Sequence, residues 1–325
     1  LERLLETNLE QTPGYGKDEH CERAKTLIRQ ACGLPQSTIE FVSGGTQANQ
    51  IVIAAILKPY QGVVCASTGH INTHETGAIE ATGHKVLALP SKDGKITAQQ
   101  IAKLCAAHWT DPSHEHTVQP GLVYLSQPTE LGTLYTRAEL GEIHKVCRQY
   151  KIPLYLDGAR MGYGLASRGS GMTLADLAAS CDVFYIGGTK VGALFGEAVV
   201  FPRHNAPGRF MTAVKQRGAL LAKGWLLGVQ FDALFTDGLY QKLGKNAIET
   251  AERLREGFRE KGFSFYLDTP TNQIFLVVDR AQREDLARKA AFSFWEQLDE
   301  ERTVIRFVTS WATRMEDVEE LIRRL

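Results

Sequence analysis

Residues 152–160 read I-P-L-Y-L-D-G-A-R and, after a helix-length interval, residues 181–196 read C-D-V-F-Y-I-G-G-T-K-V-G-A-L-F-G. Each part is an apolar run, short enough to be a buried strand, that ends abruptly in polar and glycine-rich residues. The first run places the carboxylate of Asp157, and the second the amine of Lys190, at the C-terminal end of a strand. In open α/β sheets, ligands bind in the crevice outside those ends. The two segments therefore predict an α/β fold with a ligand site at one edge of its sheet.

Short β-like runs alternate with amphipathic helical stretches between residues 40 and 202. We expect strands at 62–66, 85–89, 121–126, 153–156, 183–186 and 198–201, and helices at 46–57, 97–107 and 137–150. Near-continuous apolar strands separated by helices predict a mostly parallel sheet that is covered on both faces.

The pattern changes after residue 210. A long helix at 243–261, β-like runs at 263–267, 273–278 and 303–309, and a closing helix from residue 315 predict a smaller α+β domain. We therefore divide the chain into a large domain, residues 1–225, and a small C-terminal domain, residues 226–325.

Composition limits the function classes. Lys plus Arg and Asp plus Glu both total 37 among 325 residues, and this zero net charge argues against a nucleic-acid partner. No apolar run is long enough to span a membrane, and residues 1–30 lack a signal-peptide pattern. Six cysteines without a C-x-x-C pair predict reduced thiols and a cytoplasmic location. The chain starts at Leu1 inside a helix-like stretch, so we expect a native segment to precede it.

A glycine-rich turn follows the apolar residues 41–42: residues 43–49 read S-G-G-T-Q-A-N and open an apolar helix. Glycine lets a backbone approach a ligand closely, and a helix N-terminus offers free N–H groups to a phosphate. Gly45 and Thr46 are thus candidates for phosphate binding. An ordinary turn with Thr46 as the helix N-cap explains the same residues equally well.

His70 follows the strand expected at 62–66. A histidine at that place can stack on a cofactor ring and exchange protons near neutral pH, although a lone histidine is more often an ordinary surface or core residue. His70 and His74 are also spaced as two metal ligands on one helix face. No further ligand cluster follows them, and we therefore expect no metal.

Asp157, Arg160 and Lys190 carry the clearest chemical signal. A buried aspartate needs a partner, and a cationic ring nitrogen is one; a structural ion pair with Arg160 is another. Apolar neighbours desolvate the Lys190 amine and lower its pKa, which makes it a nucleophile, whereas most lysines are surface residues. A carboxylate that can pair with a pyridinium nitrogen and a lysine that can form a Schiff base are the two groups that a pyridoxal-phosphate enzyme needs.

Arg306 lies in the β-like run 303–309 and points to the face opposite its apolar neighbours. An arginine can hold the carboxylate of an amino acid with two parallel hydrogen bonds. On this segment alone, a solvent-exposed strand face is the preferred reading.

Taken in order, these segments resemble the threonine aldolase branch of the β-eliminating lyases, which are pyridoxal-phosphate enzymes of the aspartate aminotransferase fold (fold type I). The resemblance extends over nearly the whole chain and is most specific at residues 43–49, 70–83, 157–160 and 187–192. It implies a large domain with a mostly parallel sheet and a smaller α+β C-terminal domain.

The resemblance also implies roles for the candidate residues. Lys190 becomes the Schiff-base lysine, Asp157 the partner of the pyridine nitrogen, and His70 the ring-stacking residue and base. The remaining roles are phosphate binding by Gly45 and Thr46 with Arg160 nearby, and binding of the substrate carboxylate by Arg306. The family forms dimers or tetramers with shared active sites, and Tyr15 and Lys215 match segments near that interface.

Two segments depart from the family pattern. Residues 126–130 read S-Q-P-T-E where many threonine aldolases carry Glu-Asn-Thr-His, whose histidine can contact the β-hydroxyl of the substrate. Lys215 stands where an arginine is expected. Both departures bear on the substrate rather than on the cofactor.

The resemblance predicts a pyridoxal 5'-phosphate-dependent lyase that cleaves L-threonine or L-allo-threonine to glycine and acetaldehyde. The main alternative is β-elimination, or aldol cleavage of a bulkier β-hydroxy amino acid. A remote alternative is a non-catalytic binding protein with the same fold. The expected partners are a small amino-acid substrate and further copies of the chain, in a homodimer or homotetramer.

Overall fold

The computed structural model describes residues 1–325 and contains two β-sheets. The larger sheet has seven strands: β1 (Thr38–Val42), β2 (Gln61–Ala66), β3 (Val86–Leu89), β4 (Gln119–Ser126), β5 (Leu154–Asp157), β6 (Val183–Gly187) and β7 (Glu197–Phe201). The smaller sheet has four: β8 (Ser264–Leu267), β9 (Gln273–Val278), β10 (Ser293–Gln297) and β11 (Thr303–Val308).

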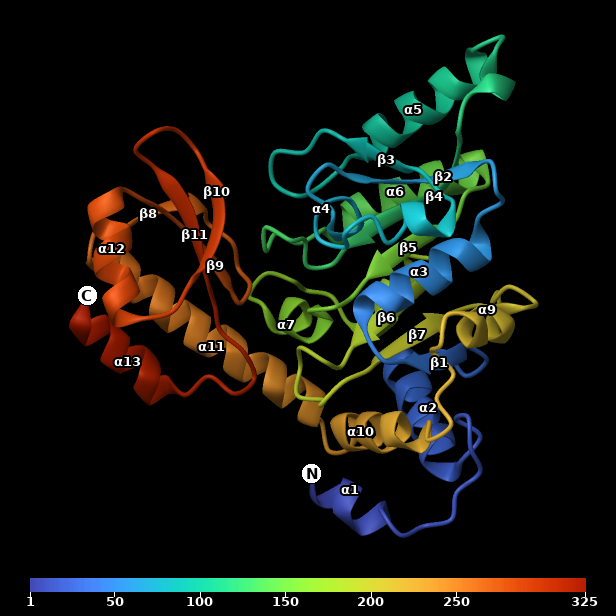
Figure 1. Cartoon of the computed structure of the whole chain (residues 1–325), viewed down its shortest axis with the longest axis horizontal. Coiled ribbons are helices and arrows are strands. Elements are labelled where there is room, and N and C mark those ends of the chain that lie inside the picture. The colour runs from blue at the N-terminus through green and yellow to red at the C-terminus, as the bar shows by residue number, and fades with distance from the viewer.

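Helices connect and cover these strands (Figure 1). Those that precede β7 are α1 (Glu2–Thr7), α2 (Glu19–Cys32), α3 (Gly45–Ile56), α4 (His70–Thr73), α5 (Ala98–Thr110), α6 (Arg137–Tyr150), α7 (Met161–Ala166) and α8 (Leu174–Ala179), with short 3-10 turns at Glu80–Thr82 and His114–His116. The later helices are α9 (Phe210–Gln216), α10 (Trp225–Phe235), α11 (Leu239–Glu260), α12 (Arg280–Lys289) and α13 (Met315–Arg324).

The seven-stranded sheet has the order β1-β7-β6-β5-β4-β2-β3. The strands β3, β2, β4, β5 and β6 are parallel, whereas β7 runs antiparallel to both β6 and β1. The C-terminal ends of the parallel strands, the end of β1 and the start of β7 therefore meet at one edge of the sheet.

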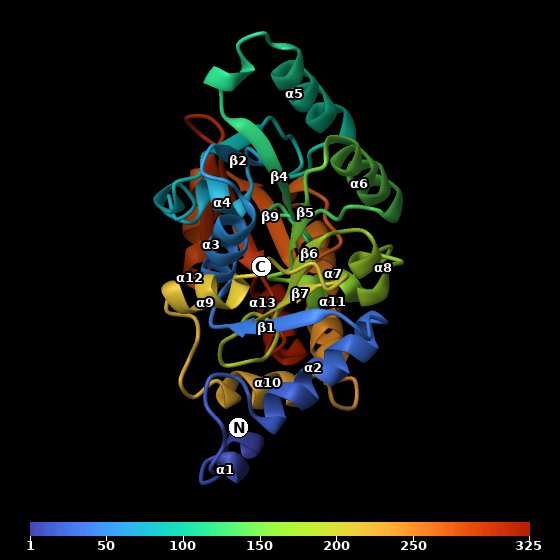
Figure 2. The same cartoon turned by 90° about the vertical axis from the view of Figure 1, so that its right-hand side faces the viewer.

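Both faces of this sheet are buried because its side chains alternate between two apolar clusters. Leu154 and Leu156 of β5 pack with residues of α2, α5, α6 and α8, while Tyr155 between them packs with residues of α3 and α9. Figure 2 shows α3 and α9 on one side of the sheet and α6 and α8 on the other. The alternation is the two-residue period of a strand, and helices on both faces give the layered architecture expected from the sequence.

The smaller sheet is antiparallel, with the order β10-β11-β9-β8. Its core joins residues of α11 and α13, such as Phe258 and Ile322, to Leu276 and Ile305 of the central strands. In Figure 1 this unit, with α12, lies to one side of the large sheet, and the long helix α11 reaches from one to the other.

The structure contains every strand and helix expected from the sequence, together with elements that were not expected, among them the helices α2, α10 and α12. The sequence pattern marks β1 only as the apolar pair before the glycine-rich turn and does not predict β10. The domain boundary between residues 225 and 226 stays a prediction. In the structure α10 packs against α2, and a Cβ added at Gly228 would lie 2.5 Å from the backbone nitrogen of Cys21, so the two helices approach as closely as glycine allows.

No helix of the structure combines the length and the apolar character that are needed to cross a membrane.

Candidate active site

A cavity of about 360 Å³ opens at the edge where the strand ends meet. The loops and turns after β1, β2, β4, β5 and β6 line it, together with the first residue of β7. The lining residues are Ser43, Gly44, Gly45, Thr46, His70, His74, Ser126, Pro128, Glu130, Asp157, Ala159, Arg160, Tyr185, Thr189, Lys190 and Glu197. The structure thus brings together all the site residues predicted from the sequence except Arg306.

Sheet register explains why distant residues become neighbours at this edge. Ser126 is paired with Asp157 at the end of β4 and β5, and Gly187 is paired with Glu197 between β6 and β7. Because β7 is antiparallel, the residue that begins it lies beside the residues that end the parallel strands.

The N-terminus of α3 forms one wall. Gly44 is the N-cap residue and no side chain caps the helix, so Thr46 lies in the first turn and the N-cap role considered for it is wrong. The first N–H groups of a helix have no partner within it and attract anions. A Cβ at Gly45 would lie 2.9 Å from the Tyr185 hydroxyl, whereas one at Gly44 would meet nothing within 4 Å. Glycine at position 45 therefore leaves room for the tyrosine that bonds Asp157.

Asp157 is 4% exposed and accepts four hydrogen bonds. The donors are the hydroxyls of Tyr124 at 2.6 Å and Tyr185 at 2.5 Å, Asn49 Nδ2 at 3.1 Å and the backbone nitrogen of Ala159 at 3.0 Å. Burial raises the pKa of Asp157, but the positive charge of His70 and the two tyrosine hydroxyls lower it by more. The carboxylate is thus held ionised inside the cavity.

Lys190 lies in the turn after β6, and its own backbone carbonyl accepts a hydrogen bond from the Tyr163 hydroxyl. Its Nζ has no hydrogen-bond or ion-pair partner in the chain. Burial, with the nearby charge of Arg160, lowers the pKa of Lys190 to about 8. A substantial fraction of the amine is therefore neutral, and nucleophilic, near physiological pH.

His70 begins α4, and its Nδ1 lies 2.8 Å from Glu75 Oε1. Burial lowers the pKa of His70, but the hydrogen bond to Glu75 and the charge of Asp157 raise it by more. Asn49 Nδ2 bonds Glu75 at 2.7 Å as well as Asp157, so the histidine and the aspartate are joined by one buried network. The His70 ring also stacks on His74 at 5.7 Å between centroids.

The two arginines occupy different places. Arg160 lines the cavity at the start of α7, and its guanidinium forms no hydrogen bond or ion pair within the chain. Arg306 on β11 is not a lining residue: its Nη1 donates to Gln273 Oε1 at 3.1 Å, and its guanidinium lies 5.2 Å from the Trp295 ring centroid. The Nε of Arg306 is buried without a partner. Its role in substrate binding stays a prediction.

Sequence reasoning missed three acids. Glu75, Glu130 and Glu197 are each no more than 6% exposed. Burial raises the pKa of Glu197 to about 8. Each acid lies next to a strand or motif that is visible in the sequence. A charged residue beside an apolar run was the signal that could have identified it as a site residue. Which of them would face the cavity depended on sheet order.

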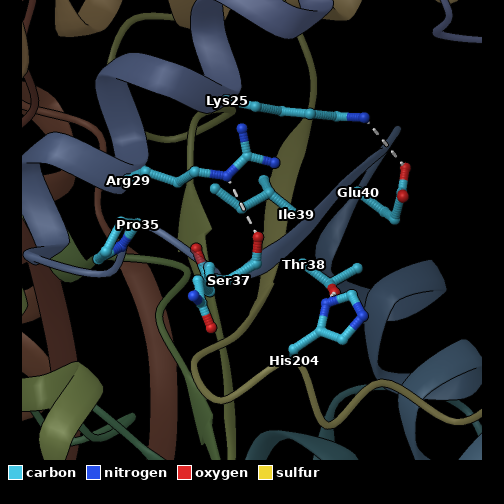
Figure 3. A pocket seen from close by; sticks show the side chains of 9 residues that line it. Lys25, Arg29, Pro35, Ser37, Thr38, Ile39, Glu40 and His204 are labelled. Carbon is cyan, nitrogen blue, oxygen red and sulfur yellow. Dashed lines mark hydrogen bonds and ion pairs between the residues drawn. The ribbon is translucent and has the colours of Figure 1, made fainter.

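A second hollow, about 480 Å³, opens at the outer edge of β1 (Figure 3). Its charged groups have partners within the chain: Lys25 Nζ lies 3.6 Å from Glu40, and Arg29 Nε donates to the Ser37 carbonyl at 3.2 Å. Thr38 and His204 form a further hydrogen bond of 3.0 Å across it. The hollow contains none of the predicted site residues.

The chain contains no group of three or more His, Cys, Asp and Glu side chains positioned to hold a metal ion.

Comparison with known proteins identifies the family. The family description "Beta-eliminating lyase" matches residues 2–321. A low specificity L-threonine aldolase of Pseudomonas aeruginosa is 30% identical over 323 residues, which cover 98% of this chain and 91% of that protein. The solved structure of Leishmania major threonine aldolase is 39% identical, with a TM-score of 0.95 over 99% of this chain and 93% of that one.

A mutant aspartate aminotransferase of Thermus thermophilus shares the fold at 14% identity, with a TM-score of 0.70 over 99% of this chain and 89% of that one. The predicted aspartate aminotransferase-like fold is therefore confirmed. With its family match over almost the entire length, this chain belongs to the beta-eliminating lyase family.

Proposed function

We propose that this protein is a pyridoxal 5'-phosphate-dependent lyase that cleaves L-threonine and L-allo-threonine to glycine and acetaldehyde. The observation that carries the proposal is the position of Lys190 and Asp157 in one cavity beside the N-terminus of α3. Its similarity to threonine aldolases over 98% and 99% of its length supports the choice of substrate.

The residues of the cavity fit the proposed cofactor. The ionised carboxylate of Asp157 suits a protonated pyridine nitrogen, and the uncapped N-terminus of α3 at Gly45 and Thr46 suits a phosphate. Arg160 offers a guanidinium that has no partner within the chain, and Lys190 offers a partly neutral amine for covalent attachment. The ring nitrogen, the phosphate and the aldehyde of the cofactor each have a chemically matched group in the cavity.

When bound, pyridoxal 5'-phosphate supplies an aldehyde that captures amines and a ring that accepts the electron pair of a broken bond at the α-carbon. The protein residues orient the substrate and move protons. In our proposal Arg306 binds the substrate carboxylate, Asp157 keeps the ring nitrogen protonated, and His70 stacks on the ring. Cleavage also needs a group to take the β-hydroxyl proton, and the cavity presents His70, which the sequence predicted, and Glu130, which it did not.

We further propose a homodimer or homotetramer with shared active sites in the cytoplasm. The N-terminal segment exposes apolar side chains, with Leu5 77% and Leu9 92% accessible, which supports a subunit contact there. Lys215 Nζ lies 5.0 Å from the Tyr15 ring centroid, so the two residues matched to the interface adjoin each other. All six cysteines are buried and free, in keeping with a reducing compartment.

A substrate panel tests the proposed reaction. The purified holoenzyme is incubated with L-threonine, L-allo-threonine, phenylserine and a β-substituted cysteine analogue, and glycine, aldehyde and pyruvate are measured. We expect equal amounts of glycine and acetaldehyde from the first two substrates. Pyruvate without glycine would point to β-elimination, and glycine from phenylserine alone to a bulkier substrate. A protein that stays colourless with added cofactor would favour the non-catalytic alternative.

A further inference from the structure

Glu130 is a buried acid of the cavity and one of its two candidates for taking the β-hydroxyl proton. It lies four residues beyond the end of β4, is 6% exposed, and lines the cavity with Ser126, Asp157 and Lys190. Burying a carboxyl group is costly unless it is hydrogen-bonded or has a function that needs it. Its position in the cavity at the C-terminal ends of the parallel strands therefore suggests a role in the reaction.

One oxygen of this carboxyl group is held and the other is free. Oε1 accepts a hydrogen bond from the backbone N–H of His70 at 3.0 Å and from the Ser126 hydroxyl at 2.5 Å. Oε2 has no partner in the chain. The two bonds fix the carboxyl group against the turn that starts α4, which leaves Oε2 available to a molecule in the cavity.

Titratable groups from several elements of the fold face Glu130. They are His70 on α4, Asp157 at the end of β5, Arg160 before α7 and Lys190 after β6, with the weakly acidic groups of Tyr124, Tyr135 and Cys65 on its other sides. Burial raises the pKa of Glu130, Asp157 raises it further, and Ser126 and His70 oppose them. A carboxylate whose pKa is raised toward neutrality is a stronger base than an exposed one.

His70 is less available than Glu130 as a proton acceptor. Its Nδ1 is bonded to Glu75, and its net pKa is raised, so a larger fraction of the ring is already protonated at a given pH. A protonated imidazole cannot accept the proton of a hydroxyl group. It remains suited to stacking on a cofactor ring and to donating a proton.

We infer that Glu130 accepts the β-hydroxyl proton of the substrate. The inference rests on the proposed aldol cleavage. As the proton passes from the β-oxygen to Glu130, the Cα–Cβ bond breaks and the β-carbon becomes the carbonyl carbon of the released aldehyde. The bonding electron pair stays with the α-carbon fragment, which takes up a proton to become glycine. Glu130 thus takes part in the proton transfer from the β-oxygen and not in the one at the α-carbon. The substrates for which it is needed are amino acids with a β-hydroxyl group.

Two reactions of the same holoenzyme separate these proton transfers. Cleavage of L-allo-threonine needs a base at the β-oxygen. Exchange of the α-hydrogen of glycine in heavy water, followed by NMR, uses the same cofactor, lysine and carboxylate-binding groups but has no β-oxygen. The visible absorbance of the bound cofactor reports loading independently of either rate.

Glu130→Gln keeps the shape of the side chain and removes its titrating group. We expect cleavage to fall about 10²–10⁴-fold, the usual contribution of a general base, while glycine exchange and cofactor absorbance stay near the wild-type values. Glu130→Asp, which keeps a carboxyl group, should retain more cleavage activity than the Gln variant. Glu80→Gln, an exposed acid in the neighbouring 3-10 turn, is the matched control and should leave both reactions unchanged.

Three results would overturn the inference: unchanged cleavage in the Gln variant, equal losses of cleavage and exchange, or a Gln variant more active than the Asp variant. Equal losses would assign Glu130 a structural role through Ser126 and His70. A wild-type enzyme that exchanges glycine but releases none from β-hydroxy amino acids would instead reject the proposed function, so the two failures are distinguishable.

Discussion

The cavity at the strand ends and the hollow beside β1 differ in how their charged groups are paired. In the hollow, Lys25 and Glu40 face each other at 3.6 Å, and Arg29 bonds the Ser37 carbonyl. In the cavity, Lys190 and Arg160 have no partner in the chain although burial lowers the pKa of each. Both are sizeable, about 480 Å³ for the hollow and about 360 Å³ for the cavity.

This difference teaches that the two regions are distinguished by whether their charged groups have partners, rather than by the presence of a hollow. Charged groups that have partners within the chain need no ligand, whereas half-buried charges without partners are a cost that a ligand can offset. The cavity keeps such groups at the edge where the sheet order brings strand ends together. Substitutions in the cavity should therefore lower activity, and substitutions in the hollow should lower the free energy of unfolding.

The largest expected effect is at Lys190. Lys190→Ala removes the covalent attachment as well as an acid–base group, so kcat should fall by at least about 10⁴-fold, the upper end for a single acid–base residue. The absorbance of the bound cofactor at about 420 nm should disappear, because no other lysine of the cavity can replace Lys190. An unchanged absorbance band and rate would show that Lys190 does not hold the cofactor, and would contradict the functional contrast between the cavity and the hollow.

A smaller loss is expected at Asp157. Asp157→Asn keeps the size of the side chain but removes the charge that holds a ring nitrogen protonated, and we expect kcat to fall about 10²–10³-fold, as when one preorganised electrostatic contact is lost. Steady-state kinetics with L-allo-threonine measures this, and absorbance titration shows whether the cofactor still binds. Full activity in a variant that binds the cofactor would contradict the assigned role.

The third expected effect is a shift in pH dependence. Only the neutral amine of Lys190 captures an aldehyde, so capture of added cofactor by the apoprotein should rise with pH and reach half its maximum at about pH 8. Arg160→Gln removes a positive charge that lowers this pKa, and its midpoint should move to higher pH. Stopped-flow absorbance gives both midpoints. A wild-type midpoint near the ordinary value of 10.5 would show that the amine is not desolvated.

The smallest effect on activity is expected in the hollow. Arg29→Ala breaks the charged hydrogen bond to the Ser37 carbonyl, and the free energy of unfolding should fall by about 1–3 kcal/mol. The kcat and KM of the holoenzyme should stay at their wild-type values. Chemical denaturation and kinetics on the same preparation check both, and a selective loss of activity would show that the hollow belongs to the functional machinery.

Much of the fold was predictable because the patterns are local. The apolar runs that end at Asp157 and before Lys190 are strands β5 and β6, and the glycine-rich turn at residues 43–46 leads into helix α3 as expected. Parallel strands end at the same edge of a sheet, so residues that follow them converge without further information. This is why Gly45, His70, Asp157 and Lys190 could be assigned to one site.

The residues missed by sequence reasoning depend on contacts between distant segments. Glu197 enters the cavity only because β7 runs antiparallel, and Glu130 meets the backbone of His70 across 60 positions of the chain. β10 has exposed residues on a short strand, so its apolar pattern was weak, yet it supplies Trp295 beside Arg306. No local period or spacing carries such information.

The sequence by itself determined the α/β class, the edge of the sheet where the candidate site lies, and the lysine and aspartate at that site. These properties follow from apolar periodicity and from residue types at strand ends, which are local. Only the tertiary structure decided the state of those groups: the charge of His70 and the hydroxyls of Tyr124 and Tyr185 keep Asp157 ionised despite its burial, and packing makes the Lys190 amine less basic by removing water. The pKa of a side chain depends on its surroundings, and folding brings those surroundings from distant parts of the chain.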